Sequence, residues 1–173
     1  MSHEIIELSS SDGSWDAFKA DWAQQCESFN EEFETYAEGA FSVVEELIEA
    51  PEKSAGVYAC RLDGRHVSMC QVNVKGLPGY DSPVMRVRFL TLSPEFDFGD
   101  KSVDEYAKVL VVTLASILAL SDEDGPMKAK YLKFHLSSPA DRQFFALLGQ
   151  GLNDDEDFTS VTLRGSWLYI TKA

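Results

Sequence analysis

The segment LTLSPEFDFGDKS, residues 90–102, gathers side chains that could take part in binding or catalysis. It stands between a run typical of a β-strand and a run typical of an α-helix. Glycine and backbone amides that precede a helix can hold a phosphate, and Gly99 and Lys101 are suited to that role. Glu95 is suited to the role of a general base, because a carboxylate can take a proton from an amine through a water molecule. The segment predicts an anion-binding loop, a general base, or an exposed loop whose acids have no catalytic role.

The rest of the chain offers weaker candidates. The three histidines lack the spacing of metal ligands, and there is no Cys-x-x-Cys pair, P-loop, dinucleotide fingerprint or serine-centred nucleophile elbow. The acidic runs at 121–125 and 154–157 lack the ligand periodicity of an EF-hand and are typical of solvated turns. The sequence therefore predicts no metal site.

The cysteines indicate buried thiols and no disulfide. Cys60 and Cys70 flank LDGR, which is typical of a two-residue hairpin turn that places Leu62 opposite Arg65. In that register the two thiols project from opposite faces of the hairpin.

Charge is concentrated near the N-terminus. The net charge is −14, and residues 1–56 carry 14 Asp and Glu against Lys19 and Lys53. This argues against direct binding to nucleic acid, whose phosphates need Lys and Arg. It allows either a solvated helical face or a surface for a basic protein partner. Under the second interpretation the contact residues are the exposed acids Glu31, Glu34 and Glu38.

Length and hydropathy predict one domain, residues 1–173, with an acidic helical region at about 14–50. A chain of 173 residues with 45% apolar residues can close a sizeable core. No apolar run approaches the roughly 20 residues that span a bilayer, and the N-terminus lacks the pattern of a signal peptide. We therefore expect a cytoplasmic protein.

Apolar periodicity predicts the order of the elements. Apolar residues at steps of three and four from Trp15 to Tyr36 predict one long helix that Gly39 ends, and a second helix extends to Pro51. Strands are expected at 4–8, 55–62, 65–74, 84–92, 128–136, 157–164 and 166–173. Helices are expected at 102–120, where Ser102 and Glu105 form a capping-box pattern, and at 138–149. In the strand at 84–92, Phe89 should share a face with Met85 and Val87.

This element order, with two local patterns, resembles the GNAT superfamily of acyltransferases. The first pattern is VRFLTLSPEFDFGDKSVDEYAKVLV, which is similar to the family's strand, loop and central helix. The resemblance covers nearly the whole chain. It implies an α/β fold with a central mixed, mostly antiparallel sheet flanked by helices, and acyl transfer from acyl-CoA to an amine.

The resemblance also shows where the loop departs from the family pattern. The family has a Gln/Arg-x-x-Gly-x-Gly/Ala loop that holds the pyrophosphate of coenzyme A. Here Asp97 takes the Gln/Arg position, while Asp100 and Ser102 take the two glycine positions. Two carboxylates at this place repel an anion. If the family's contacts were kept, the candidate cofactor-binding residues would be Leu92, Phe98, Gly99, Asp100, Lys101 and Ser102.

The second pattern is SSPADRQFFALLGQGL, which is similar to a family segment that carries a tyrosine general acid. Phe145 takes the position of that tyrosine and has no proton to donate, and Gln150 takes the position of a family phenylalanine.

Two hypotheses follow. The first is a GNAT-fold protein that has lost acetyl-CoA-dependent catalysis, has no cofactor and acts by binding a protein partner. The second is an active, divergent N-acyltransferase that holds acyl-CoA through the amides of residues 98–102 and the strand end at 90–92, with Glu95 as a weak candidate for the catalytic base. An exposed strand edge or the aromatic helix face could also support a homodimer.

Overall fold

The computed structural model describes residues 2–173, and its centre is a sheet of seven strands. The strand order is β1-β2-β3-β4-β5-β7-β6, with β4 and β5 parallel and all other neighbours antiparallel. The predicted fold class, a mixed and mostly antiparallel sheet flanked by helices, is confirmed. The strands are β1 (His3–Glu7), β2 (Ala55–Leu62), β3 (Arg65–Lys75), β4 (Val84–Leu92), β5 (Tyr131–His135), β6 (Phe158–Arg164) and β7 (Trp167–Lys172).

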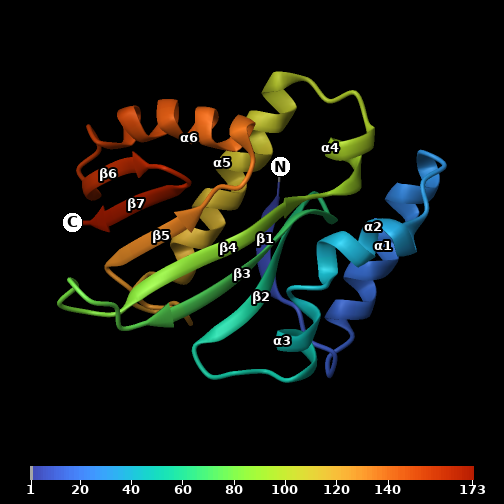
Figure 1. Cartoon of the computed structure of the whole chain (residues 1–173), viewed down its shortest axis with the longest axis horizontal. Helices are drawn as coiled ribbons and strands as arrows, with labels where there is room; N and C mark the ends of the chain where they lie inside the picture. Colours follow the sequence, from blue (N-terminus) through green and yellow to red (C-terminus); the bar gives the residue numbers. More distant parts are fainter. Residues whose placement is uncertain (1) are drawn as a thin grey trace.

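Helices pack on both faces of the sheet, and on one of the two faces they cover only some of the strands. Helices α5 and α6 share one core with residues of β2–β7, while α1–α3 pack on the opposite face of β2 and β3. In Figure 1, α1–α3 lie in front of this part of the sheet, and α5 passes behind β4 and β5. The helices are α1 (Ser14–Ser28), α2 (Phe33–Phe41), α3 (Glu45–Glu49), α4 (Pro94–Phe98), α5 (Val103–Leu120) and α6 (Pro139–Leu152).

The prediction of one long helix to Tyr36 was wrong. Helix α1 ends at Ser28, and Asn30 adopts a left-handed conformation with φ 56°. The Glu31 amide then bonds back to the Cys26 carbonyl at 3.0 Å, which is the closure typical of a helix C-terminus. Asn is the non-glycine residue that tolerates this conformation best. Gly39, the predicted break, lies inside α2.

A β-bulge changes the register of the predicted β2–β3 hairpin. Leu62 pairs with Arg65 as predicted, but Cys60 pairs with Ser68, because Val67 is an extra residue in β3. Cys70 then pairs with Tyr58, which places both thiols on the same face, toward α5. The prediction of opposite faces was therefore wrong. All three cysteines are free and buried, as predicted.

A second bulge reshapes the end of β4. Met69 pairs with Thr91 and Gln71 with Arg88, so two β4 residues oppose one residue of β3. Phe89 lies in the bulge with φ 56° and is exposed, while Leu90 packs against the core. The prediction that Phe89 shares a face with Met85 was wrong, because period-two alternation fails at a bulge.

Strands β4 and β5 pair over only part of their length. The parallel ladder runs from Val84 with Tyr131 to Val87 with Phe134. Beyond this point β4 continues to Leu92, and the two strands no longer pair. The unpaired end of β4 leads into the segment that the sequence singled out.

Candidate functional site

The predicted site begins where β4 ends, and backbone contacts hold that end in place. The Tyr36 hydroxyl, from α2, donates a hydrogen bond to the Leu92 carbonyl at 3.1 Å. The Ser93 amide donates to the Val67 carbonyl, in the β3 bulge, at 2.9 Å. The Leu92 carbonyl, a candidate cofactor contact, is thus already hydrogen-bonded within the chain.

Residues Pro94–Phe98 form the short helix α4, and Gly99 ends it. Its amide bonds to the Glu95 carbonyl at 3.0 Å, and its φ of −88° is accessible to any residue. A Cβ atom at this position would overlap the Glu95 carbonyl oxygen and lie 3.1 Å from the Phe29 ring. The glycine is therefore required for close packing at the end of α4. Phe98 contributes to the same packing, with its ring centroid 5.7 Å from that of Tyr36.

Glu95 and Lys101 neutralise each other. The Glu95 carboxylate lies 2.6 Å from an Arg65 nitrogen and 3.3 Å from the Lys101 ammonium group. Lys101 also lies 3.7 Å from Glu105. Both side chains are thus paired within the chain, and a phosphate would have to compete with Glu95 and Glu105 for the Lys101 ammonium group.

Ser102 caps helix α5. Its hydroxyl accepts a hydrogen bond from the Glu105 amide at 3.2 Å, and its own amide donates to the Glu105 carboxylate at 2.9 Å. This confirms the predicted capping box. The reciprocal bonds use two of the donors that a helix N-terminus offers to an anion, and they place a carboxylate there.

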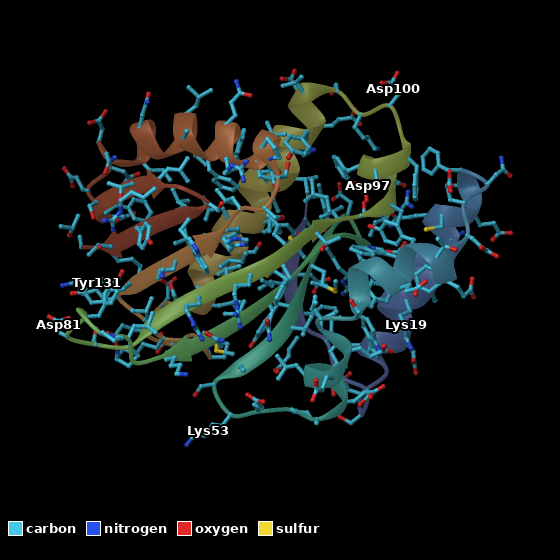
Figure 2. The ribbon with its side chains drawn as sticks, in the orientation of Figure 1. Lys19, Lys53, Asp81, Asp97, Asp100 and Tyr131 are labelled. Carbon is cyan, nitrogen blue, oxygen red and sulfur yellow. The ribbon has the colours of Figure 1, made fainter. Side chains whose placement is uncertain are left out.

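Two further acids surround this helix start. Asp97 and Asp100 are exposed, on α4 and on the loop that follows it (Figure 2). Burial, followed by the nearby Asp97 carboxylate, raises the pKa of Tyr36 above its usual value. The structure therefore has exposed acids at the place where the GNAT resemblance implied a glutamine or arginine and a glycine.

On α6, Phe145 is buried against the ring of Phe134, at a centroid distance of 5.6 Å. Gln150 is exposed near the end of the helix. The buried carboxylate on this helix is Asp141, which accepts a hydrogen bond from the Tyr106 hydroxyl of α5. Burial raises the pKa of Asp141. This pair joins α5 to α6.

The predicted partner-binding acids lie on the helices in front of the sheet. Glu34 and Glu38 stand one turn apart on α2, and Glu31 precedes that helix; all three side chains are exposed. Within residues 2–173, none of the three forms an ion pair.

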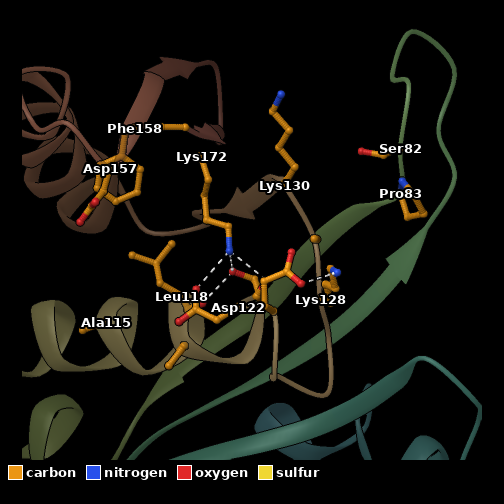
Figure 3. Close-up of a pocket in the computed structure, with 15 residues that line it drawn as sticks. Ser82, Pro83, Ala115, Leu118, Asp122, Lys128, Lys130, Asp157, Phe158 and Lys172 are labelled. Atoms are coloured by element: carbon orange, nitrogen blue, oxygen red, sulfur yellow. Dashed lines mark hydrogen bonds and ion pairs between the residues drawn. The ribbon is translucent and has the colours of Figure 1, made fainter.

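The structure has one cavity beside the candidate site and a larger one at the opposite end of the same strands. One of about 270 Å³ lies beside the Glu95 ion pairs, and its charged lining residues are three cations and three acids: Arg65, Lys101, Lys108, Asp63, Glu95 and Glu105. Its charge is therefore balanced. Another, of about 920 Å³, lies beyond the opposite ends of β4 and β5, between Pro83, Leu118 and Phe158. There the Lys172 ammonium group donates to the Ser121 carbonyl at 2.9 Å, while Lys130 points away from this contact (Figure 3).

Sequence reasoning missed Arg65 and Tyr36 at this site. Arg65 was assigned only to a hairpin turn, and Tyr36 only to an apolar helix face. Their contacts, with Glu95 and Leu92, join residues 30 and 56 positions apart in the chain. No local pattern could have predicted them.

Residues 2–173 contain neither a cluster of metal-ligating side chains nor a helix that could span a membrane. No three His, Cys, Asp or Glu side chains are grouped so that they could hold a metal ion. Among the helices described, none combines the length and apolar character needed to cross a membrane.

Comparisons with known proteins find matches among solved structures. No family model and no curated protein sequence matches the chain. An aminoglycoside acetyltransferase from an uncultured soil sample matches at a TM-score of 0.47 and 16% identity, over 96% of this chain and 100% of that one. The ribosomal-protein-alanine N-acetyltransferase of Brucella melitensis matches at 0.46 and 17%, over 95% and 100%.

A third match is the PaiA N-acetyltransferase of Thermoplasma acidophilum, solved in complex with coenzyme A. Its TM-score is 0.46 at 16% identity, over 100% of both chains. At these scores and identities the matches carry no argument about activity or ligands. The strand order and the short parallel ladder of β4 and β5 describe the fold independently of them.

Proposed function

We propose that this chain, whose fold is of the GNAT type, is a binding protein that does not transfer acyl groups. The observation that carries the proposal is the state of the segment from Pro94 to Glu105. Its glycine is required for packing, its lysine is ion-paired, and its helix start is capped by Glu105. Gly99, the Lys101 ammonium group and the Ser102 amide are thus each engaged with another part of the chain.

Electrostatics supports the same conclusion. A phosphate within about 5 Å of a carboxylate is repelled by about 3 kcal/mol at an effective dielectric constant near 20. Asp100 and Glu105 lie on either side of the Ser102 cap, and Lys101 is already shared between Glu95 and Glu105. Coenzyme A would have to overcome this repulsion, so we propose that the protein uses no cofactor.

The residues at the positions of the family's general acid and of the candidate base also support the proposal that the chain does not transfer acyl groups. Each oxygen of the Glu95 carboxylate is in an ion pair, one with Arg65 and the other with Lys101, so a substrate amine would have to compete with these two cations. Phe145 is buried and has no proton to donate. The position that the resemblance assigns to the general acid therefore has no acid, and the candidate base is already ion-paired.

The surface proposed for partner binding is formed by Glu31, Glu34 and Glu38. These exposed acids lie in the part of the chain that carries most of the excess negative charge, and they suit a partner with a basic segment. Because the carboxylates are not paired within the chain, a partner need not break internal ion pairs to reach them.

A titration with a fluorescein-labelled peptide of about ten lysines tests this surface. The triple change Glu31→Lys, Glu34→Lys and Glu38→Lys should weaken binding at least about tenfold, because attraction becomes repulsion. The control changes Asp124, Asp154 and Glu156 to Lys and alters the net charge equally at other exposed acids. If both variants lose the same affinity, binding depends only on total charge and the proposed surface is wrong.

One observation favours the alternative, an active and divergent N-acyltransferase. The pairing of β4 with β5 ends at Val87, and β4 continues to Leu92 without a β5 partner, which is where an extended acyl-CoA arm would bind under this alternative. Under this alternative the amides of residues 98–102 would hold the phosphates. Binding of acetyl-CoA distinguishes the two functions.

A further inference from the structure

A part of the sheet has one face that no helix covers. Helices α1–α3 pack on one side of β2 and β3, and the same side continues over β4, β5, β7 and β6. The register shows this continuity, since Asn73 pairs with Arg86, Arg86 with Lys133, and Lys133 with Tyr169. Figure 1 shows these strands with no helix in front of β4, β5 or β7.

This open face is cationic in a strongly acidic protein. The four strands contain no Asp or Glu. We call the open sheet face a set of six outward side chains of these strands, four cations and two aromatic residues beside them, namely Arg86, Arg88, Lys133, Arg164, Trp167 and Tyr169. All six are partly or well exposed.

The four cations of the open sheet face have no acidic partners. Within residues 2–173, none of them forms an ion pair. Burial and the neighbouring Arg88 both lower the pKa of Arg86. Two arginines held side by side on a sheet repel each other, and an anion placed between them would relieve that repulsion.

Aromatic rings lie between the cations. The Lys133 ammonium group is 4.6 Å from the Trp167 ring centroid and 5.2 Å from that of Tyr169. The Arg164 guanidinium carbon is 4.3 Å from the Tyr169 centroid. These contacts hold the charges over an apolar platform, which favours a ligand with both acidic and apolar groups.

We propose that the open sheet face binds an acidic peptide segment of a protein partner. Its carboxylates would pair with Arg86, Arg88, Lys133 and Arg164, and its apolar side chains would rest on Trp167 and Tyr169. The face lies on the same side of the sheet as the acidic helices α1–α3. A peptide is favoured over a nucleic acid, because a long polyanion on this face would also be repelled by those helices.

Fluorescence anisotropy with a fluorescein-labelled peptide that alternates glutamate and leucine over about ten residues tests the proposal. Binding should weaken with added salt, and it should fall at least about tenfold when Lys133→Glu and Arg164→Glu are combined. The matched control, Lys53→Glu with Lys108→Glu, reverses two exposed cations elsewhere and gives the same net charge. It should change the affinity by less than about twofold.

Trp167 provides a second readout. Trp15 and Trp22 are buried in the core, so peptide-dependent change in tryptophan fluorescence should come from Trp167 and disappear in Trp167→Phe. If the charge-reversed variant does not fold, the combined change Lys133→Gln and Arg164→Gln should also weaken peptide binding more than the control variant does. Equal loss in the two charge-reversed variants, no binding by the wild type, or tighter binding of a single-stranded oligothymidine would each overturn the proposal.

Discussion

Replacement of Gly99 by alanine distinguishes packing from phosphate binding. In the structure, the added methyl group overlaps the Glu95 carbonyl oxygen and presses on the Phe29 ring. Overpacking of this kind costs about 1–3 kcal/mol, because the end of α4 must move away from α1. In a chain of this length 1 kcal/mol corresponds to about 2–4 °C, so a cost of about 2 kcal/mol lowers the midpoint by about 4–8 °C.

The assay is thermal unfolding followed by circular dichroism, with Gly39→Ala as the control. Gly39 lies inside α2, where a Cβ atom would have nothing within 4 Å, so alanine there should stabilise the helix by roughly 0.5–1 kcal/mol. The two substitutions are chemically identical and should shift the midpoint in opposite directions. A Gly99→Ala protein that unfolds at or above the wild-type temperature would refute the packing role.

Three other predictions concern stability. Ser102→Ala removes the cap of α5 and should lower the free energy of unfolding by about 1 kcal/mol in urea denaturation; no loss would contradict the capping box. Asn30→Val places a β-branched residue at φ 56° and should cost about 1 kcal/mol or more in the same assay, whereas Asn30→Gly should be tolerated. Burial, followed by the charge of Cys60, raises the pKa of Cys70 from 9.0 to about 12, so the folded state holds this proton more tightly than the unfolded state does. The contribution of Cys70 to stability should therefore be complete below about pH 9 and be lost as the pH rises toward 12, and a Cys70→Ala protein should show a flatter decline over that range.

Element order was predictable because it depends on local periodicity. The apolar stripe of α5 and the capping pattern of Ser102 with Glu105 both lie within one helix, where spacing in sequence fixes spacing in space. The face of the sheet to which each side chain of β3 and β4 points was not predictable. Val67 and Phe89 lie in bulges that follow no strong sequence pattern, and each bulge reverses the face of the residues beyond it.

The same distinction holds at the candidate site. The acids of the loop could be read from the sequence, and their conflict with a phosphate followed from charge alone. The partners of Glu95 and Leu92 could not be read, because Arg65 and Tyr36 reach the loop only through the folding of β3 and α2. The open sheet face was hidden for the same reason, since its cations come from strands that are distant in the chain and adjacent only in the sheet.

Calorimetric titration of the wild-type protein with acetyl-CoA is the most direct test of the proposed loss of acyl transfer. We predict no heat of binding at millimolar ligand and no rise in the unfolding midpoint, because Gly99, the Lys101 ammonium group and the Ser102 amide are engaged within the chain. Saturable binding that raises the midpoint, and that a bulky residue at Ser102 abolishes, would contradict the proposal and support the active N-acyltransferase.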